Sequence, residues 1–197
     1  MKTVEFLFDY GSPFSYLANT QLPALIQRTG ASVVYTPVLL GGVLKATGNS
    51  SPIAVPAKGS YMRLELKRWA HRYRVPEPVN PFFPINTMRL MRGAIASQQL
   101  DIFDRYHATI FDAFWAKGLN LGDEGVLTRV LEAGGLPAAE IARAMEPHEV
   151  KDRLRRDTDD AVARGMFGAP AFFVGGEMFW GNDRLDWVED ALRSMPA

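Results

Sequence analysis

Ser12 is the residue in this chain whose position most favours chemistry. It lies in the segment Asp9-Tyr10-Gly11-Ser12-Pro13-Phe14, directly after an apolar run. Proline is common as the first helical residue, so Ser12 is predicted at a strand-to-helix junction, where unpaired backbone N–H groups attract anions. Two roles fit this position. Ser12 is either a plain helix N-cap or a cap whose hydroxyl also donates a hydrogen bond to a bound anion, such as an external thiolate.

A direct nucleophilic role for Ser12 is less favoured, because no G-x-S-x-G elbow surrounds it and a serine nucleophile needs a nearby base. The chain contains no cysteine, which excludes disulfides, thiolate metal sites and a dithiol redox cycle of its own. The histidines are isolated and lack metal-ligand spacing, so no metal site is predicted at His71, His107 or His148.

A second candidate site is Ala169-Pro170, within Phe167-Gly168-Ala169-Pro170-Ala171-Phe172. Proline at the start of a strand pattern has two interpretations. It is a trans, structural strand start, or a cis bond turns the backbone of Ala169 outward. In the second case an extended ligand pairs with the N–H and C=O of Ala169 as a short added strand.

A third candidate is the segment Trp180-Gly181-Asn182-Asp183. Asn182 or Asp183 is suited to cap the last helix. The same arrangement suits a bound zwitterion, with backbone N–H groups taking its carboxylate and Asp183 taking its ammonium group.

Polar residues of the middle segment form the last candidate group: Lys45, Asn49, Ser50 and Asn86. A solvated loop or a helix cap explains each of them. If the loop closes over Ser12, Lys45 is placed to pair with a substrate carboxylate, and the amides to hydrogen-bond it.

These residues must be positioned by the elements around them. Thr3–Phe8 reads as a buried strand, about 13–29 as a helix ending at Gly30, and 31–38 as a second strand. This spacing predicts a βαβ unit with a parallel strand pair.

The middle of the chain is predicted to be mostly helical. A turn-rich loop is predicted over 41–52, and the residues Met62, Leu66, Trp69 and Tyr73 then recur at helical spacing. One further helix is predicted to begin at a cap at Asn86, and another to run from a cap at Asp101 to Gly118. Shorter helices are predicted over 123–133, 137–145 and 148–164. Strands over 171–174 and 177–180 then flank a Gly175-Gly176 turn, and a helix over 183–194 ends the chain.

The order β-α-β, helical block, β-β-α predicts an α/β, thioredoxin-like fold with a large helical insertion. The thioredoxin-like domain is expected to be discontinuous, over 1–40 and 165–197. The insertion is expected over 41–164, with its last helices packing on the thioredoxin-like domain.

Composition narrows the function classes. Lys and Arg together number 22, as do Asp and Glu, which argues against a general nucleic-acid binder. No apolar run approaches the length of a membrane span. The first strand begins within three residues of the start, leaving no room for a signal peptide, so the expected compartment is the cytoplasm.

Four segments, taken together in this order, resemble the family of 2-hydroxychromene-2-carboxylate isomerases and kappa-class glutathione transferases, which are thioredoxin folds with a DsbA-like insertion. The segments are Phe8-Asp9-Tyr10-Gly11-Ser12-Pro13-Phe14-Ser15-Tyr16, Gly42-Val43-Leu44-Lys45-Ala46-Thr47-Gly48-Asn49, Gly165-Met166-Phe167-Gly168-Ala169-Pro170 and Phe179-Trp180-Gly181-Asn182-Asp183-Arg184-Leu185. The resemblance covers nearly the whole chain.

The resemblance implies a role for each candidate residue. Ser12 would hold and activate the glutathione sulfur, and Ala169 would pair with the tripeptide backbone beside a cis Pro170. The γ-glutamyl end would be bound by Trp180, Gly181, Asn182 and Asp183, and the aromatic carboxylate by Lys45, Asn49, Ser50 and Asn86.

The activity implied is a glutathione-dependent isomerisation between 2-hydroxychromene-2-carboxylate and trans-o-hydroxybenzylidenepyruvate, in naphthalene-type catabolism, by a homodimer. Two alternatives stay open. One is a kappa-class transferase or peroxidase that consumes glutathione, and the other is a non-catalytic binding module on the same scaffold.

Overall fold

The chain begins with a parallel strand pair, as the sequence predicts. The computed structural model describes residues 2–196, and in it β1 (Thr3–Phe8) pairs in parallel with β2 (Ser32–Pro37). Gly30 ends the preceding helix with a left-handed φ of 66°, and its N–H donates to the carbonyl of Ile26. The predicted βαβ unit is therefore confirmed.

The predicted single helix over about 13–29 is wrong, because the segment is divided into α1 (Pro13–Asn19) and α2 (Leu22–Thr29). Pro23 explains the division. It has no N–H to donate to the carbonyl of Asn19, and its ring would clash with that carbonyl if one helix ran through.

A hairpin completes the sheet. The antiparallel strands β3 (Ala171–Val174) and β4 (Glu177–Trp180) are joined by Gly175 and Gly176, whose φ values of 57° and 93° suit a two-residue turn. Because β3 also pairs antiparallel with β1, the strand order is β2-β1-β3-β4. The predicted hairpin is confirmed.

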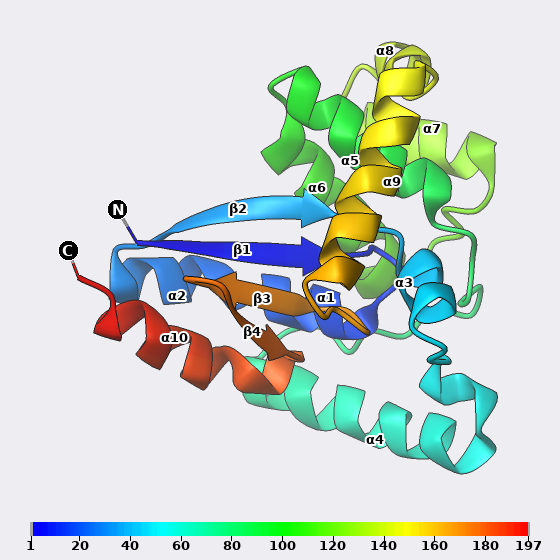
Figure 1. The fold of residues 1–197 in the computed structure, drawn as a ribbon. Coiled ribbons are helices and arrows are strands. Elements are labelled where there is room, and N and C mark those ends of the chain that lie inside the picture. The colour runs from blue at the N-terminus through cyan, green and yellow to red at the C-terminus, as the bar shows by residue number, and fades with distance from the viewer. Residues whose placement is uncertain (1, 197) are drawn as a thin grey trace.

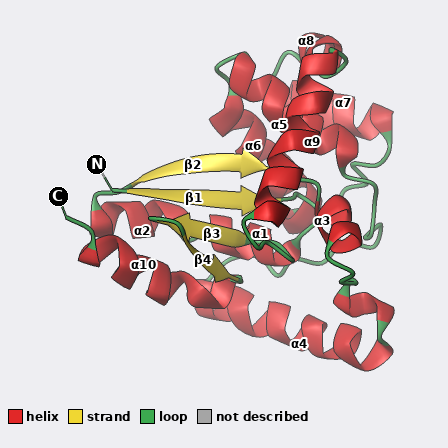
Figure 2. Cartoon of the chain, in the orientation of Figure 1, coloured by secondary structure: helices red, strands yellow, loops and turns green. Residues whose placement is uncertain are grey.

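Helices occupy the chain between β2 and β3 (Figure 2). They are α3 (Leu40–Ala46), the 3-10 turn η1 (Pro52–Ala54), α4 (Pro56–Tyr73), α5 (Met88–Gln99), α6 (Phe103–Phe111), the π-helical turn η2 (Asp112–Ala116), α7 (Glu124–Ala133), α8 (Ala138–Ala144) and α9 (His148–Ala163). The 3-10 turn η3 (Asn182–Arg184) and α10 (Leu185–Ser194) follow β4. Within residues 2–196, no helix has both the length and the apolar character required to cross a membrane. The element order confirms the predicted fold class.

The predicted loop over 41–52 is wrong in its first half, which forms α3. Tertiary hydrogen bonds hold the start of this helix. The N–H of Leu39 donates to Oγ1 of Thr158 at 3.0 Å, and the N–H of Leu40 donates to Oδ2 of Asp9 at 2.8 Å. These contacts override the low helix propensity of the Gly41-Gly42 pair.

The predicted cap at Asn86 is confirmed one position earlier than the formal N-cap, Thr87, because Oδ1 of Asn86 accepts from the N–H of Met88, the first residue of α5, at 3.0 Å. The predicted cap at Asp101 is wrong, since Ile102 occupies the N-cap position of α6. Asp101 instead has a positive φ of 55°, which belongs to the turn between the two helices. The α6 segment does not run as one regular helix to Gly118, because it widens into η2 after Phe111.

The two faces of the sheet pack against different helices. Side chains alternate along β1, so Phe6 and Phe8 join the large core that includes residues of α2, α5, α6 and α10, whereas Leu7 joins a smaller core with Val43 of α3 and Ala161 of α9. Figure 1 shows α2 and α10 along one side of the strands, and the helices α5 to α9 gathered near the carboxyl ends of β1 and β2. The residues that follow β1 therefore lie where the helical block meets the sheet.

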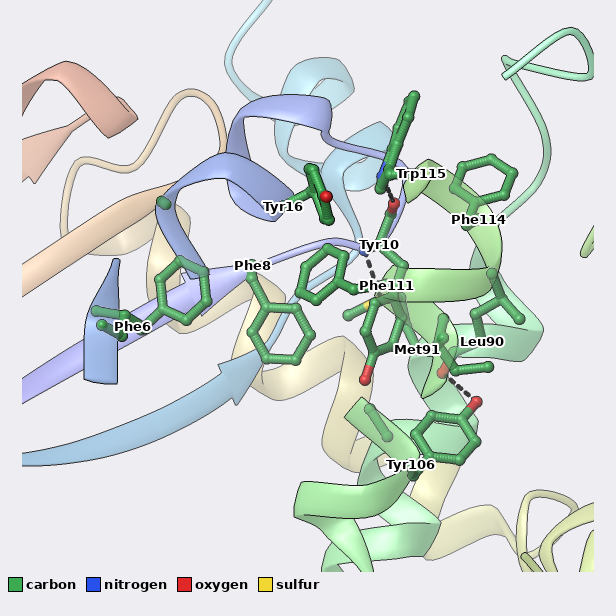
Figure 3. Packing of buried hydrophobic residues seen from close by; sticks show 14 of the residues in the cluster. Phe6, Phe8, Tyr10, Tyr16, Leu90, Met91, Tyr106, Phe111, Phe114 and Trp115 are labelled. Carbon is green, nitrogen blue, oxygen red and sulfur yellow. Dashed lines mark hydrogen bonds between the residues drawn. The ribbon is translucent and has the colours of Figure 1, made fainter. Parts of the chain in front are cut away.

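Aromatic rings fill that junction (Figure 3). Tyr10 packs edge-to-face with Phe8 and Phe111, and its carbonyl accepts a hydrogen bond of 2.7 Å from the indole N–H of Trp115. The Tyr10 hydroxyl lies 3.1 Å from Nδ1 of His107, which is buried. These contacts fix the backbone two residues before Ser12.

The His107 ring is held in one tautomer by its two partners. Its Nε2 lies 2.9 Å from Oδ1 of Asn19. Since an amide oxygen only accepts hydrogen bonds, Nε2 carries the proton and the Tyr10 hydroxyl donates to Nδ1.

We expect acid to destabilise the protein through His107. Burial lowers the pKa of His107 to about 3, so at intermediate pH the unfolded chain binds a proton that the folded chain does not. Stability should therefore fall as the pH drops from about 6.5 toward 3, by up to about 1.4 kcal/mol per pH unit. Urea unfolding at about pH 7 and about pH 5 measures the effect. Between these two pH values, the free energy of unfolding should fall less for His107→Gln than for the wild type. Equal decreases would contradict the proposal that His107 causes the loss of stability in acid.

Candidate active site

Ser12 is the N-cap of α1, as predicted. Its backbone is extended, with φ −95° and ψ 112°, and its Oγ accepts a hydrogen bond of 3.1 Å from the N–H of Ser15. The hydroxyl proton is directed to a distant part of the chain, the carbonyl of Ala169, at 3.0 Å. Two of the candidate segments are thus joined by a direct hydrogen bond.

Asp9 holds the turn that carries Ser12. Its Oδ1 accepts from the N–H of Gly11 at 2.8 Å, and its Oδ2 accepts from the N–H of Leu40 at 2.8 Å and from the hydroxyl of Thr87 at 3.0 Å. Burial raises the pKa of Asp9, and these three hydrogen bonds oppose the rise. The carboxylate therefore ties the Ser12 turn to the starts of α3 and α5.

The Ala169-Pro170 peptide bond is cis, one of the two forms that the sequence leaves open. The Ala169 carbonyl accepts from the Ser12 hydroxyl. Among residues 2–196, no backbone carbonyl accepts a hydrogen bond from the Ala169 N–H. A donor next to Ser12 is therefore available to a ligand.

Two adjoining cavities open at this point. The first, which we call the Ser12 cavity, has a volume of about 330 Å³. It is lined by Gly11, Ser12, Pro13, Phe14, Leu40, Leu44, Asn49, Ser50, Ser51, Pro52, Val55, Lys58, Met62, Phe83, Gly168, Ala169 and Trp180. The second, the hairpin cavity, has a volume of about 560 Å³ and lies beside the β4–α10 connection. Both volumes fall in the range of small-molecule sites.

The hairpin cavity shares one wall with the Ser12 cavity, made of Phe14, Pro52, Lys58, Met62, Ala169 and Trp180. Its other lining residues are Ala57, Tyr61, Glu65, Trp69, Pro170, Gly181, Asn182, Asp183 and Arg184. Charged groups of both signs therefore line it.

The structure brings most of the predicted residues together. Ala169 and Trp180 line both cavities, and Ser12, Asn49 and Ser50 line the Ser12 cavity. The hairpin cavity is lined by the remaining residues of the third candidate segment and by Pro170. Residues predicted from distant segments of the sequence thus line two adjoining cavities.

Lys45 and Asn86 lie apart from this group. Both are exposed, and neither is among the residues that line the two cavities. Asn86 uses its side-chain oxygen locally, accepting from the N–H of Met88 at 3.0 Å.

The cap predicted at Asn182 or Asp183 is wrong. Neither η3 nor α10 has a side-chain cap hydrogen bond. The Asp183 carboxylate pairs instead with the guanidinium of Arg184. Asn182 is buried, and its carbonyl accepts from the hydroxyl of Tyr73 at 2.9 Å. Asn182 therefore anchors the β4–α10 connection to α4.

Lys58 is the main functional candidate that sequence reasoning missed. Among the described residues, it is the only charged side chain lining the Ser12 cavity, and it also lines the hairpin cavity. A single cation in an otherwise largely apolar cavity suits an apolar ligand that carries a carboxylate. No signal in the sequence indicated a role for Lys58. The residue lies near the start of α4, and only tertiary packing decides which face of α4 meets α1.

The chain is similar to known proteins over nearly its whole length. The model of the DSBA-like thioredoxin domain matches residues 3–193. The chain is 34% identical over 193 residues to the 2-hydroxychromene-2-carboxylate isomerase of Sphingobium xenophagum, an alignment that covers 97% of this chain and 98% of that protein. It is 26% identical to glutathione S-transferase kappa 1 of Rattus norvegicus, over 94% of this chain and 88% of that protein. A solved structure of 2-hydroxychromene-2-carboxylate isomerase superposes with a TM-score of 0.86 at 34% identity, covering 96% of this chain and 94% of that one.

Proposed function

Since this chain belongs to the DSBA-like thioredoxin domain family and is an isomerase related to the 2-hydroxychromene-2-carboxylate isomerases, we propose that it interconverts 2-hydroxychromene-2-carboxylate and trans-o-hydroxybenzylidenepyruvate with glutathione as a recycled cofactor. One observation carries the proposal. The Ser12 hydroxyl lines a largely apolar cavity with one cation, and this cavity shares a wall with a second cavity that is lined by charges of both signs. This arrangement suits an aromatic acid and a zwitterionic peptide side by side.

The hairpin cavity has the groups that glutathione requires. Its volume of about 560 Å³ is sufficient for a small peptide. The Ala169 N–H and carbonyl would pair with the tripeptide backbone, as in strand addition. Asp183 would take the ammonium group of the γ-glutamyl end, beside Trp180, Gly181 and Asn182.

Ser12 would act through its hydroxyl proton. In the structure that proton is donated to the Ala169 carbonyl, and a rotation about the side-chain bond would direct it to a sulfur atom. Donation to a charged sulfur is stronger than donation to a neutral carbonyl, so the hydroxyl favours the thiolate form. Glutathione, when bound, would supply a thiolate whose reversible addition to the enone of the open-chain acid makes the former double bond a single bond, which can rotate before the thiolate leaves and the double bond re-forms.

The other residues of the Ser12 cavity would orient the acid. Lys58 would pair with its carboxylate, and Asn49 and Ser50 would hydrogen-bond it. Phe14, Leu44 and Met62 would enclose the ring and exclude water. Lys45 and Asn86, implied by the family resemblance, would contribute only if the exposed segments that carry them closed over the cavity.

The proposal therefore predicts different effects on KM for substitutions of Lys58 and Lys45. Lys58→Met should raise the KM for the aromatic acid by up to about fivefold, because Lys58 lines the cavity but is exposed, and an exposed ion pair is worth about 0.2–1 kcal/mol. Lys45→Met is the matched control, since Lys45 is also exposed but lines neither cavity, and its KM should stay unchanged. Steady-state kinetics of the two variants measures both KM values. If the Lys45 variant shows the larger rise, the segment carrying Lys45 closes over the acid during the reaction.

The overall function is tested by following the conversion of the chromene acid with glutathione present at a small fraction of the acid concentration. We expect many turnovers per glutathione and no net loss of the tripeptide. Loss of glutathione in proportion to product would replace the proposal with the kappa-class transferase alternative. If calorimetry detects no binding of glutathione, the non-catalytic binding module is favoured instead.

The same family likeness supports two wider proposals. The aromatic acid would arise in naphthalene-type catabolism, and the active form would be a homodimer. Light scattering of the purified protein tests the second point, and a monomeric mass would exclude it.

A further inference from the structure

A third cavity lies behind the wall of the Ser12 cavity. We call it the Trp115 cavity; its volume is about 330 Å³, and its lining comprises Pro13, Ile53, Met62, Arg63, Leu66, Glu77, Pro78, Val79, Asn80, Phe83 and Trp115. It shares Pro13, Met62 and Phe83 with the Ser12 cavity. A movement of these shared side chains would join the two spaces.

Met62 is placed to control that passage. Among the described residues it is the one that lines all three cavities. It is partly buried and packs against the large core. Methionine has an unbranched, flexible side chain, so it can change rotamer at low cost in a crowded wall.

Aromatic rings form part of the lining of the Trp115 cavity. Trp115 is buried, and its indole N–H donates to the Tyr10 carbonyl at 2.7 Å. The ring of Phe83 lies 5.3 Å from the Trp115 ring, centroid to centroid. The charged lining residues, Arg63 and Glu77, are exposed, so the cavity has an apolar interior and a polar mouth, which suits an aryl ring carrying a hydroxyl group.

The proposed reaction needs two positions for such a ring. In the ring-closed acid the aryl group and the carboxylate lie in one compact bicyclic unit. In the trans open-chain acid they lie at opposite ends of an extended chain. If Lys58 holds the carboxylate in both forms, the ring must move to a new place.

We propose that the Trp115 cavity is the binding site for the aryl ring of the trans open-chain acid, and that the ring passes Met62 to reach it. This inference rests on the proposed function. No bond forms or breaks in this movement. The compact acid occupies the Ser12 cavity alone, so the two cavities together distinguish the two isomers by shape.

Binding of two unreactive probes tests the proposal without relying on turnover. One is chroman-2-carboxylate, a compact analogue, and the other is trans-(2-hydroxystyryl)acetate, an extended analogue without the keto group. Val79 is exposed, and it lines the Trp115 cavity but neither of the other two cavities. Val79→Trp is therefore designed to fill the Trp115 cavity alone. Leu64→Trp is the matched control, an exposed α4 position that lines none of the three cavities.

We expect Val79→Trp to weaken calorimetric binding of the extended probe by about tenfold or more, and to leave the compact probe within about twofold. Leu64→Trp should leave both unchanged. Ile53→Trp fills the same cavity from another element and should repeat the Val79 result. Equal effects on both probes, or no effect on either, would overturn the proposal.

Glutathione binding is measured on the same samples to separate the two hypotheses. If the wild type binds glutathione and converts the acid while the probes fail to discriminate, the Trp115 cavity proposal fails alone. If the wild type neither binds glutathione nor converts the acid, the proposed function fails, and the aryl-site proposal fails with it.

Discussion

Ser12→Ala is expected to lower turnover of the aromatic acid by about 100-fold. The Ser12 hydroxyl is a preorganised hydrogen-bond donor to the proposed thiolate, and loss of one such donor to an anion in an active site has an effect of this order. Glutathione held by the variant should also be the weaker acid, by about tenfold in its acidity constant, because it loses a charge-assisted hydrogen bond. The fold should lose only the cap, about 1 kcal/mol. A large decrease in turnover with a small decrease in the free energy of unfolding would show that the Ser12 hydroxyl takes part in the reaction and does more than cap the helix.

The measurement is an ultraviolet titration of the thiolate in the complex with glutathione, run beside steady-state kinetics. Ser15→Ala is the matched control on the same helix. The Ser15 hydroxyl is buried and has no hydrogen-bond partner among the described residues, and the contact to Ser12 comes from the Ser15 backbone. We expect wild-type acidity and turnover from the Ser15 variant. An unchanged titration in Ser12→Ala would remove Ser12 from the mechanism.

Asp9→Ala should produce the second large effect, this time on stability and site assembly together. The substitution would leave the N–H groups of Gly11 and Leu40 and the hydroxyl of Thr87 without their acceptor. Each unpaired buried donor costs about 1–3 kcal/mol. The cost of burying the carboxylate, which raises its pKa, offsets part of the loss. A net loss of about 3–4 kcal/mol is therefore expected.

Urea unfolding of the variant measures this loss, and Asp104→Asn provides the control, because Asp104 is an exposed carboxylate on α6. Glutathione affinity should also fall in Asp9→Ala at a temperature where the variant remains folded, since the Ser12 turn and α3 lose their common anchor. A loss below about 1 kcal/mol with normal affinity would show that Asp9 holds neither the fold nor the site.

The elements that local chemistry defines were predictable from the sequence. The β1 strand, the Gly30 helix end and the Gly175-Gly176 hairpin each follow from the few residues that form them. The cap role of Ser12 is of the same kind. The assembly of the site required more, because only the combination of four distant segments indicated that they meet.

The features that tertiary contacts define were not predictable. Helix α3 forms across Gly41-Gly42 because the N–H groups at its start donate hydrogen bonds to Thr158 of α9 and to Asp9. Lys58 lines the site because α4 packs against α1 on one particular face. Asp9 gave a weak signal, a carboxylate at the end of an apolar strand, but its three partners are separated from it by up to 78 residues.

The hydrogen bond from Ser12 to the Ala169 carbonyl would limit how strongly the site assists the sulfur of the proposed cofactor. Any ligand atom that takes the hydroxyl proton must compete with that resting acceptor. A neutral thiol, a poor acceptor, gains nothing by the exchange, whereas a charged sulfur gains about 1–2 kcal/mol, the difference between charged and neutral hydrogen bonds. Under the proposed function, the Ser12 hydroxyl would therefore favour the ionised sulfur of bound glutathione over its un-ionised form by roughly tenfold.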